Sequence, residues 1–178
     1  MAHPKQRQFL QSVVDSHPEF FSGGKIIEIG SLNINGTVRD FFVQPDEYFG
    51  VDLSPGPCVD LVEEGQNVDF PNEYFDVAIS AECFEHNPQW EATFVNMIRM
   101  TRSGGLVVFT CATEGRKEHG TTRSEPETSP FTVEKGWDYY RNLTADDFAH
   151  LGIDDLFVTY EFSVQSEVHD LYFYGLKR

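Results

Sequence analysis

Residues 25–36 read KIIEIGSLNING, a short apolar run that enters a segment with two glycines and two asparagines. An apolar run of this length, bounded by turn residues, predicts a buried strand and its exit turn. Glycine lets the backbone turn sharply and approach a ligand, and asparagine tolerates positive φ. The glycines at 30 and 36 do not form the G-x-G-x-x-G pattern of dinucleotide-binding proteins. The segment therefore predicts either a plain strand-to-helix turn or a ligand-binding one.

Further apolar runs follow along the chain, separated by turn residues or by stretches with helical spacing. Strands are predicted at residues 25–29, 48–51, 59–62, 75–80, 106–111, 156–164 and 171–176, and helices at 4–15, 37–43, 88–101 and 145–151. The third helix is expected to stop at the Ser-Gly-Gly turn of residues 103–105. Strands alternating with helices predict an α/β fold with helices on both faces of a mostly parallel sheet. Only six residues separate the last two runs, so these strands are expected to pair antiparallel.

The segment 112–143 shows neither helical nor strand periodicity. A loop of this length inside a compact domain is usually functional or disordered. Trp137, Tyr139 and Tyr140 make it too apolar for a free linker. Because it follows the carboxyl end of the fifth strand, it is predicted to form a lid over a site at that edge of the sheet.

Length, charge and cysteine content limit the domain organisation and the partners that this chain is expected to have. The 178 residues suit a single domain, 1–178, and 13 Lys and Arg against 29 Asp and Glu give a net charge of −16. Such a charge makes nucleic acid and anionic membranes poor partners. The three cysteines have no CxxC spacing, which indicates reduced thiols and no zinc site. With no 18-residue apolar run and no signal-peptide pattern, a cytoplasmic protein is expected, and its oligomeric state stays open.

The residues that follow each predicted strand are the site candidates, because ligands of such sheets bind beyond the carboxyl ends of the strands. Asp52 ends the second strand, 24 residues beyond Glu28, where a carboxylate can accept hydrogen bonds from both hydroxyls of a ribose. An Asp in this position is also a common turn former. Acidic residues at 63–64 follow the third strand, and the segment SAECFEH at 80–86 follows the fourth. Polar residues after four successive strands favour one shared ligand.

The order of these segments resembles the class I S-adenosylmethionine-dependent methyltransferases, in particular the small-molecule group called type 11. The resemblance rests on IIEIGS and the following NG, on GVD at the second strand, on FDVAISAECFEH, and on MTRSGGLVVF before the fifth strand's exit. It covers roughly residues 25–178. It implies a three-layer α/β sandwich around a seven-stranded sheet of order 3-2-1-4-5-7-6 with an antiparallel last strand. It also implies S-adenosylmethionine as the cofactor and a small molecule as the methyl acceptor.

On the methionine side of that cofactor, the resemblance implies contacts from the first and fourth strands. Glu28 would orient the glycine turn and the methionine ammonium, and Gly30 and Ser31 would lie under the methionine. The carbonyl of Ser80 would accept a hydrogen bond from the ammonium. Gly36 is assigned to the cofactor as well, although the family usually places its second glycine nearer the strand.

On the adenosine side, the resemblance implies contacts from the second and third strands. Asp52 would bind both ribose hydroxyls, and Leu53 would pack on the adenine. Glu64 would accept a hydrogen bond from the adenine amino group, with the Gly65 N–H at a ring nitrogen. Glu63, the preceding residue, fits the role assigned to Glu64 equally well.

Candidate residues for the acceptor come from the fourth strand's exit and the long segment. We expect His119 and Tyr139 as catalytic residues, and a substrate contact from each of His86, Arg123, Trp137 and Tyr140. Alternatively, these residues have no catalytic role: the histidines would lie in an exposed loop, and the aromatic side chains would only pack the segment onto the sheet. Methyl transfer is an in-line displacement that needs alignment of the acceptor and removal of its proton, so no metal is expected.

Two other functions remain open at this stage. One is a nicotinamide-dependent oxidoreductase on a similar sheet, which the missing glycine pattern disfavours. The other is a module that binds the cofactor without turnover. The tetrapeptide Asn-Pro-Gln-Trp at 87–90 is similar to the NPPY-type motif of nucleic-acid methyltransferases, but helix initiation explains its proline better.

Overall fold

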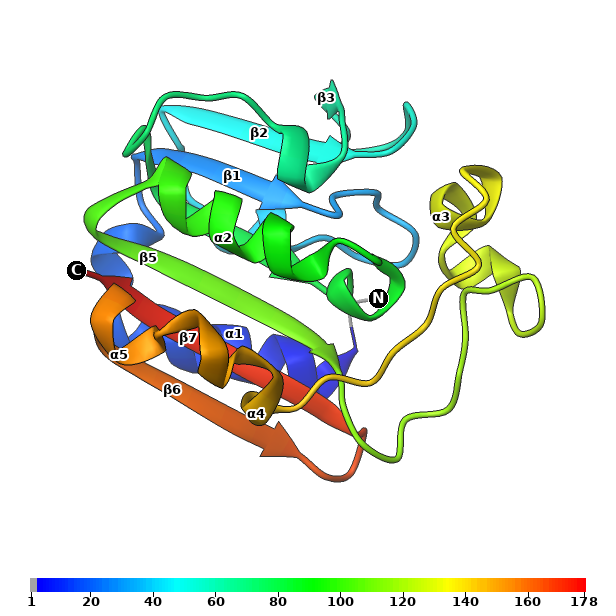
Figure 1. Ribbon diagram of the computed structural model, residues 1–178. Helices are drawn as coiled ribbons and strands as arrows, with labels where there is room; N and C mark the ends of the chain where they lie inside the picture. The colour runs from blue at the N-terminus through cyan, green and yellow to red at the C-terminus, as the bar shows by residue number, and fades with distance from the viewer. Residues whose placement is uncertain (1–2) are drawn as a thin grey trace.

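One seven-stranded sheet forms the centre of the computed structural model, which describes residues 3–178 (Figure 1). The strands are β1 (Lys25–Ile29), β2 (Glu47–Asp52), β3 (Leu61–Val62), β4 (Phe75–Ala81), β5 (Thr101–Ala112), β6 (Phe157–Gln165) and β7 (Asp170–Lys177). Their spatial order is β3-β2-β1-β4-β5-β7-β6. All pairs are parallel except those that β7 makes with β5 and β6. The predicted fold class is therefore confirmed, including the antiparallel last strand.

Helices cover both faces of this sheet. The covering helices are α1 (Pro4–Ser16), α2 (Trp90–Met100), α4 (Ala145–Phe148) and α5 (Ile153–Leu156). The short helix α3 (Pro130–Glu134) lies apart from the sheet, beyond the carboxyl ends of its strands (Figure 1). Figure 1 shows α2, α4 and α5 in front of the sheet and α1 behind it. Alternate residues of each strand point to opposite faces, so the strands supply two separate apolar clusters. The front cluster includes Phe94 and Phe109, and the rear one includes Leu10 and Val108.

Three predicted helix boundaries were wrong. Residues 37–43 form only a 3₁₀ turn, Val38–Phe41, because Pro45 follows closely and disfavours helical φ and ψ at the residue before it. The Ser-Gly-Gly segment 103–105, where the third helix was expected to stop, lies inside β5, because β5 begins directly after α2. The pairing of β5 with β4 shifts its register at this segment. The helix expected over 145–151 is α4 followed by a 3₁₀ turn, and α5 was not predicted.

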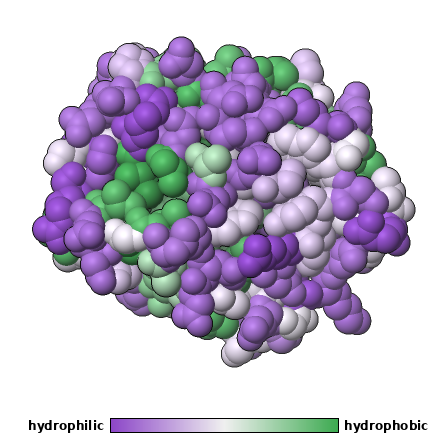
Figure 2. All heavy atoms as spheres, viewed as in Figure 1, coloured by the Kyte–Doolittle hydropathy of each residue, from purple (hydrophilic) through white to green (hydrophobic). Residues whose placement is uncertain are grey.

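The surface agrees with the acidic composition. In the orientation of Figure 1, hydrophilic residues cover most of the face, and hydrophobic residues gather in one patch left of its centre (Figure 2). Within the described residues, no helix combines the length and the apolar character that a membrane span requires.

Candidate functional site

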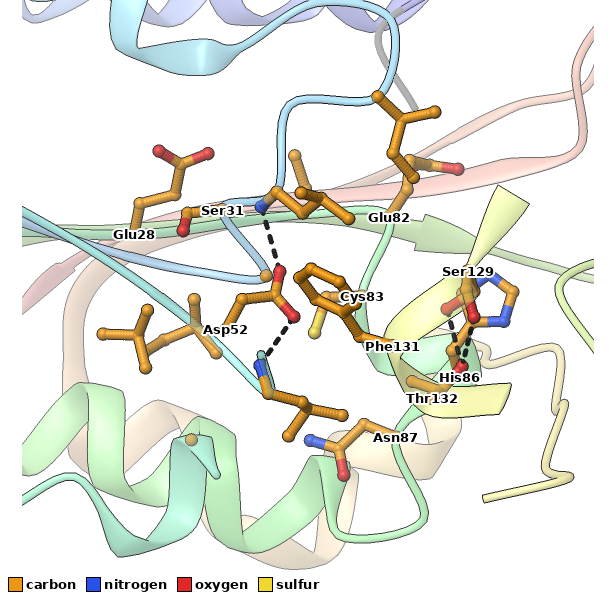
Figure 3. A pocket seen from close by; sticks show the side chains of 18 of the residues that line it. Glu28, Ser31, Asp52, Glu82, Cys83, His86, Asn87, Ser129, Phe131 and Thr132 are labelled. Carbon is orange, nitrogen blue, oxygen red and sulfur yellow. Dashed lines mark hydrogen bonds between the residues drawn. The ribbon is translucent and has the colours of Figure 1, made fainter. Parts of the chain in front are cut away.

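A cavity lies beyond the carboxyl ends of β1, β2 and β4, under α3 (Figure 3). About 930 Å³ of empty space lies within it, a volume that includes its mouth open to solvent. The predicted residues that line it are Glu28, Gly30, Ser31, Gly36, Asp52, Leu53, Gly65, His86 and Trp137. The strand ends thus converge on one cavity, as the topology requires.

Gly30 makes the turn that leaves β1. Its φ is +80°, and a Cβ at this position would lie 2.7 Å from the Cβ of Cys83. Its N–H donates to the carbonyl of Val51 at 2.9 Å, which ties the turn to β2. Only glycine fits here without a shift of the neighbouring loop.

Asp52 fixes the loops on both sides of the cavity. Its carboxylate accepts hydrogen bonds from the N–H of Leu32 at 2.9 Å and of Leu53 at 2.8 Å (Figure 3). Burial raises the pKa of Asp52, and these two N–H groups oppose that rise. Each carboxylate oxygen keeps a second lone pair, so the group can still accept from two hydroxyls of a ligand.

Glu28 is a buried acid at the base of the cavity. Its side chain is 3% exposed and accepts a hydrogen bond from the Tyr48 hydroxyl at 2.7 Å. Burial raises its pKa to about 7 despite that hydrogen bond. Nearby, the Ser31 hydroxyl is buried without a hydrogen-bond partner. A buried polar atom of this kind calls for a partner such as a ligand or an ordered water.

Two predicted cofactor residues do not line the cavity. The Glu64 carboxylate forms an ion pair with Lys135 at 2.6 Å and accepts from the Gln66 side chain, and Glu63 lines the cavity instead. The Ser80 hydroxyl donates to the carbonyl of Ile29 at 2.9 Å, and the next residue along β4 reaches the cavity. Both assignments stay predictions.

The acceptor candidates are divided between a buried cluster and the surface. His86 lies between His119 and Tyr140, with ring centroids 4.9 and 5.5 Å away. Burial lowers the pKa of His86 to about 3, so the ring is neutral. Arg123 pairs with two acids at the surface and does not reach the cavity. Tyr139 is half-buried, and burial raises the pKa of its hydroxyl, but it does not line the cavity either.

Part of the segment 112–143, residues 128–132 and Trp137, lines the cavity, and α3 lies beyond the carboxyl ends of the strands in Figure 1. Phe131, on α3, projects into the cavity, and its ring tip would lie 3.1 Å from a Cβ at Gly56. Gly120 sits where a Cβ would come within 2.7 Å of the His86 ring. With the Lys135–Glu64 pair, these contacts join the segment to three loops around the cavity. Its action as a lid stays a prediction.

Several lining residues were not among the sequence candidates. They are Gln6, Leu32, Glu82, Cys83, Asn87, Ser129, Phe131 and Thr132, among others. Glu82 and Cys83 directly follow β4, so the strand-end argument could have included them. No sequence signal marks Gln6 or Phe131, because distant segments bring these side chains to the cavity.

Comparisons with known proteins agree with this architecture. Residues 36–109 match the family model described as a methyltransferase domain. No curated protein matches the sequence. The fold is similar to phosphoethanolamine N-methyltransferase 2 from Haemonchus contortus, solved with S-adenosyl-L-methionine, at a TM-score of 0.67 and 16% identity. That alignment covers 96% of this chain and 52% of the other, so this chain spans about half the length of that enzyme.

A second similar structure is 1,6-didemethyltoxoflavin-N1-methyltransferase from Burkholderia thailandensis, solved with its substrate and S-adenosylhomocysteine. Its TM-score is 0.60 at 16% identity, and the alignment covers 99% of this chain and 91% of the other. The family match and the strand order together confirm the resemblance to the class I methyltransferases, of the type 11-like kind.

Proposed function

We propose that this chain binds S-adenosylmethionine in the cavity and transfers its methyl group to a small-molecule acceptor. The observation that carries the proposal is the convergence of Glu28, Gly30 and Asp52 on one cavity at the carboxyl ends of β1 and β2. The family match and the fold support the same class of reaction.

The residues present fit this cofactor. Asp52 offers free lone pairs to the two ribose hydroxyls, and the unpartnered Ser31 hydroxyl offers a donor and an acceptor. Gly65 lines the cavity, and a Cβ there would lie 2.6 Å from Thr93 and 2.9 Å from Ile29, so only glycine lets this turn pack so closely against α2 and β1. When bound, S-adenosylmethionine supplies an electrophilic methyl group.

The chain's own residues then have to align the acceptor, exclude water and take up a proton. Phe131 and Trp137, from the segment 112–143, line the cavity and could shield part of it from solvent. The His119 Nδ1 hydrogen-bonds to the carbonyl of Lys117 at 3.0 Å, which leaves Nε2 as a free proton acceptor. The catalytic roles predicted for His119 and Tyr139 stay predictions, because neither side chain lines the cavity.

The acceptor is proposed to be a small molecule carrying a hydroxyl or amine, because the cavity is deep and the net charge of −16 repels nucleic acid. The test is a transfer assay with S-adenosylmethionine labelled in its methyl group and a panel of hydroxyl- and amine-bearing compounds. Transfer to at least one compound, reduced by Asp52→Ala, is expected. Cofactor binding without transfer to any compound would instead support a binding module without turnover.

A further inference from the structure

A second cluster of chemically active side chains lies beside the cavity. Glu85, His86 and His119 each offer one ligand atom, and these atoms all lie within 4.8 Å of one another. The three residues are 0%, 4% and 7% exposed, respectively. Glu85 and His86 come from the loop after β4, and His119 comes from the segment 112–143.

This cluster contains several buried polar atoms without a hydrogen-bond partner. Among residues 3–178, no hydrogen-bond partner is found for either carboxylate oxygen of Glu85, the Nδ1 of His86 or the hydroxyl of Tyr140. Leaving a buried polar group unpaired costs about 1–3 kcal/mol, and more for a charged one. Four such atoms on three neighbouring residues therefore call for a further partner, such as a bound group or an ordered water.

His119 is oriented to act as a ligand. A carbonyl oxygen has no proton to give, so the short contact between Nδ1 and the Lys117 carbonyl requires the proton on Nδ1. The lone pair of Nε2 then faces away from that carbonyl. Histidines that bind metals usually donate their other ring N–H to a backbone carbonyl or a carboxylate in this way.

A neighbouring cluster provides a useful contrast. His3, Glu82 and Asp170 also place ligand atoms within 4.8 Å of one another. In that cluster, however, Asp170 accepts hydrogen bonds from His3 at 2.6 Å and from Arg116 at 3.2 Å. Its carboxylate is therefore already neutralised within the protein, whereas no Lys or Arg of the described residues pairs with Glu85, and the neutral His86 ring approaches it only to 4.0 Å.

From this geometry we infer that Glu85, His86 and His119 form a binding site for a divalent transition-metal ion. Two imidazoles and one carboxylate suit Zn²⁺, Fe²⁺ or Co²⁺ better than Ca²⁺ or Mg²⁺, which prefer oxygen ligands. Ligands of one tetrahedral Zn²⁺ lie about 3.4 Å apart, so small side-chain rotations would close this set around the ion. Three protein ligands leave one position open to a water or a substrate atom. This site departs from the expectation, drawn from the sequence, that no metal is involved.

The inferred metal site adjoins the cavity, so a bound metal ion could contact the acceptor. His86 belongs both to the metal cluster and to the lining of the cavity. An oxygen atom of the acceptor could therefore occupy the open position, a consequence that rests on the proposed function. The Nε2 lone pair cannot bind a metal and accept a proton at once, so metal binding would make His119 a ligand and not the base.

Metal binding can be tested without turnover. The purified chain of 178 residues, stripped with a chelator, is titrated with Co²⁺ alone, and visible absorption is followed. We expect bands that saturate at one equivalent and disappear when Zn²⁺ is added, together with a rise in melting temperature. The same sample is then tested for S-adenosylmethionine binding, so that failure of the metal site and failure of the proposed function are distinguishable.

Variants locate the site. Glu85→Gln, which keeps the side chain's shape, and His119→Ala, in the loop, should each weaken Co²⁺ binding at least tenfold. His150→Ala removes an exposed histidine that pairs with Glu91 and should leave binding unchanged. Circular dichroism checks that each variant is folded, and His119→Ala remains informative if Glu85→Gln does not fold. The inference is overturned if the unmodified chain shows no Co²⁺ bands, or if His119→Ala binds Co²⁺ as tightly as the unmodified chain.

Discussion

Gly30 packs against Cys83 so closely that a Cβ at position 30 would lie 2.7 Å from the Cβ of Cys83. Gly30 follows β1 and Cys83 follows β4, so their contact sets the spacing of two loops that line the cavity. The close approach brings the backbone of the first loop to the cavity wall, where a side chain would displace one loop or the other.

Gly30→Ala should therefore destabilise the protein and weaken cofactor binding. Left-handed φ and a forced contact together should cost about 2–4 kcal/mol of unfolding free energy. The matched control is Gly136→Ala, where φ is +79° but no atom lies within 4 Å of the added Cβ. The control should cost only about 1 kcal/mol. Equal losses for both variants in urea denaturation would show that the contact with Cys83 is unimportant.

Asp52→Ala should weaken S-adenosylmethionine binding by roughly 2–3 kcal/mol, because hydrogen bonds to a charged group are strong. This corresponds to a Kd roughly 30–150 times higher. Asp69→Ala removes the same charge from an exposed position that does not line the cavity. It should bind the cofactor as the unmodified chain does. An unchanged Kd for Asp52→Ala would mean that Asp52 only holds the Leu32 and Leu53 turns.

The sheet could be predicted from the sequence because each strand is a short apolar run with clear ends. β1 was predicted with its observed bounds, and the last two strands were predicted to be antiparallel from the length of their connection alone. Helix boundaries were less accurate where short segments depend on tertiary contacts. The turn at Val38–Phe41 is one such segment, since its neighbour Val43 bridges to Ser22 and cannot continue a helix.

The cavity's floor could be predicted in the same way, because Glu28, Gly30 and Asp52 follow strands whose ends must meet. The side chains that cover the cavity could not be predicted from the sequence. Phe131 reaches the cavity from a segment without periodicity, and the sequence does not say where such a segment folds back. The cluster of Glu85, His86 and His119 was also missed, because 32 residues separate its two parts and the proximity arises only from the fold.

Glu28 should make stability depend on pH. Its pKa is raised from 4.5 to about 7, mainly by burial, so the folded state holds a proton that the unfolded state releases between these values. Glu28 thus contributes roughly 3 kcal/mol to the free energy of unfolding below pH 4.5, and this contribution is lost as the pH rises to about 7.

The test compares the unfolding free energies of the unmodified chain and Glu28→Gln across that range. Glu28→Gln should gain stability relative to the unmodified chain between pH 4.5 and 7. Tyr48→Phe removes the hydroxyl that donates to the carboxylate at 2.7 Å and should move the midpoint to higher pH. Parallel stability curves for the unmodified chain and Glu28→Gln would refute the raised pKa.

The segment 112–143 should exchange its amide hydrogens more slowly when cofactor product and acceptor are both bound. Because residues 113–143 lie outside the strand ladder, we expect this segment to be less stable than the sheet in the free protein, although Gly120, Phe131 and Lys135 contact the loops around the cavity. Hydrogen exchange measured by mass spectrometry resolves this segment from β1 and β4. Equal protection with and without ligands, together with full activity of His119→Ala and Tyr139→Phe, would leave the segment without a role in the reaction.

The most direct measurement of the central claim is calorimetric titration of the chain with S-adenosylmethionine, with NAD as the comparison ligand. The account predicts one binding site with a Kd in the micromolar range, and no heat of binding with NAD. The cavity supplies Asp52 for a ribose but lacks the glycine pattern that holds a pyrophosphate. Binding of NAD, with no binding of S-adenosylmethionine at millimolar concentration, would contradict the account.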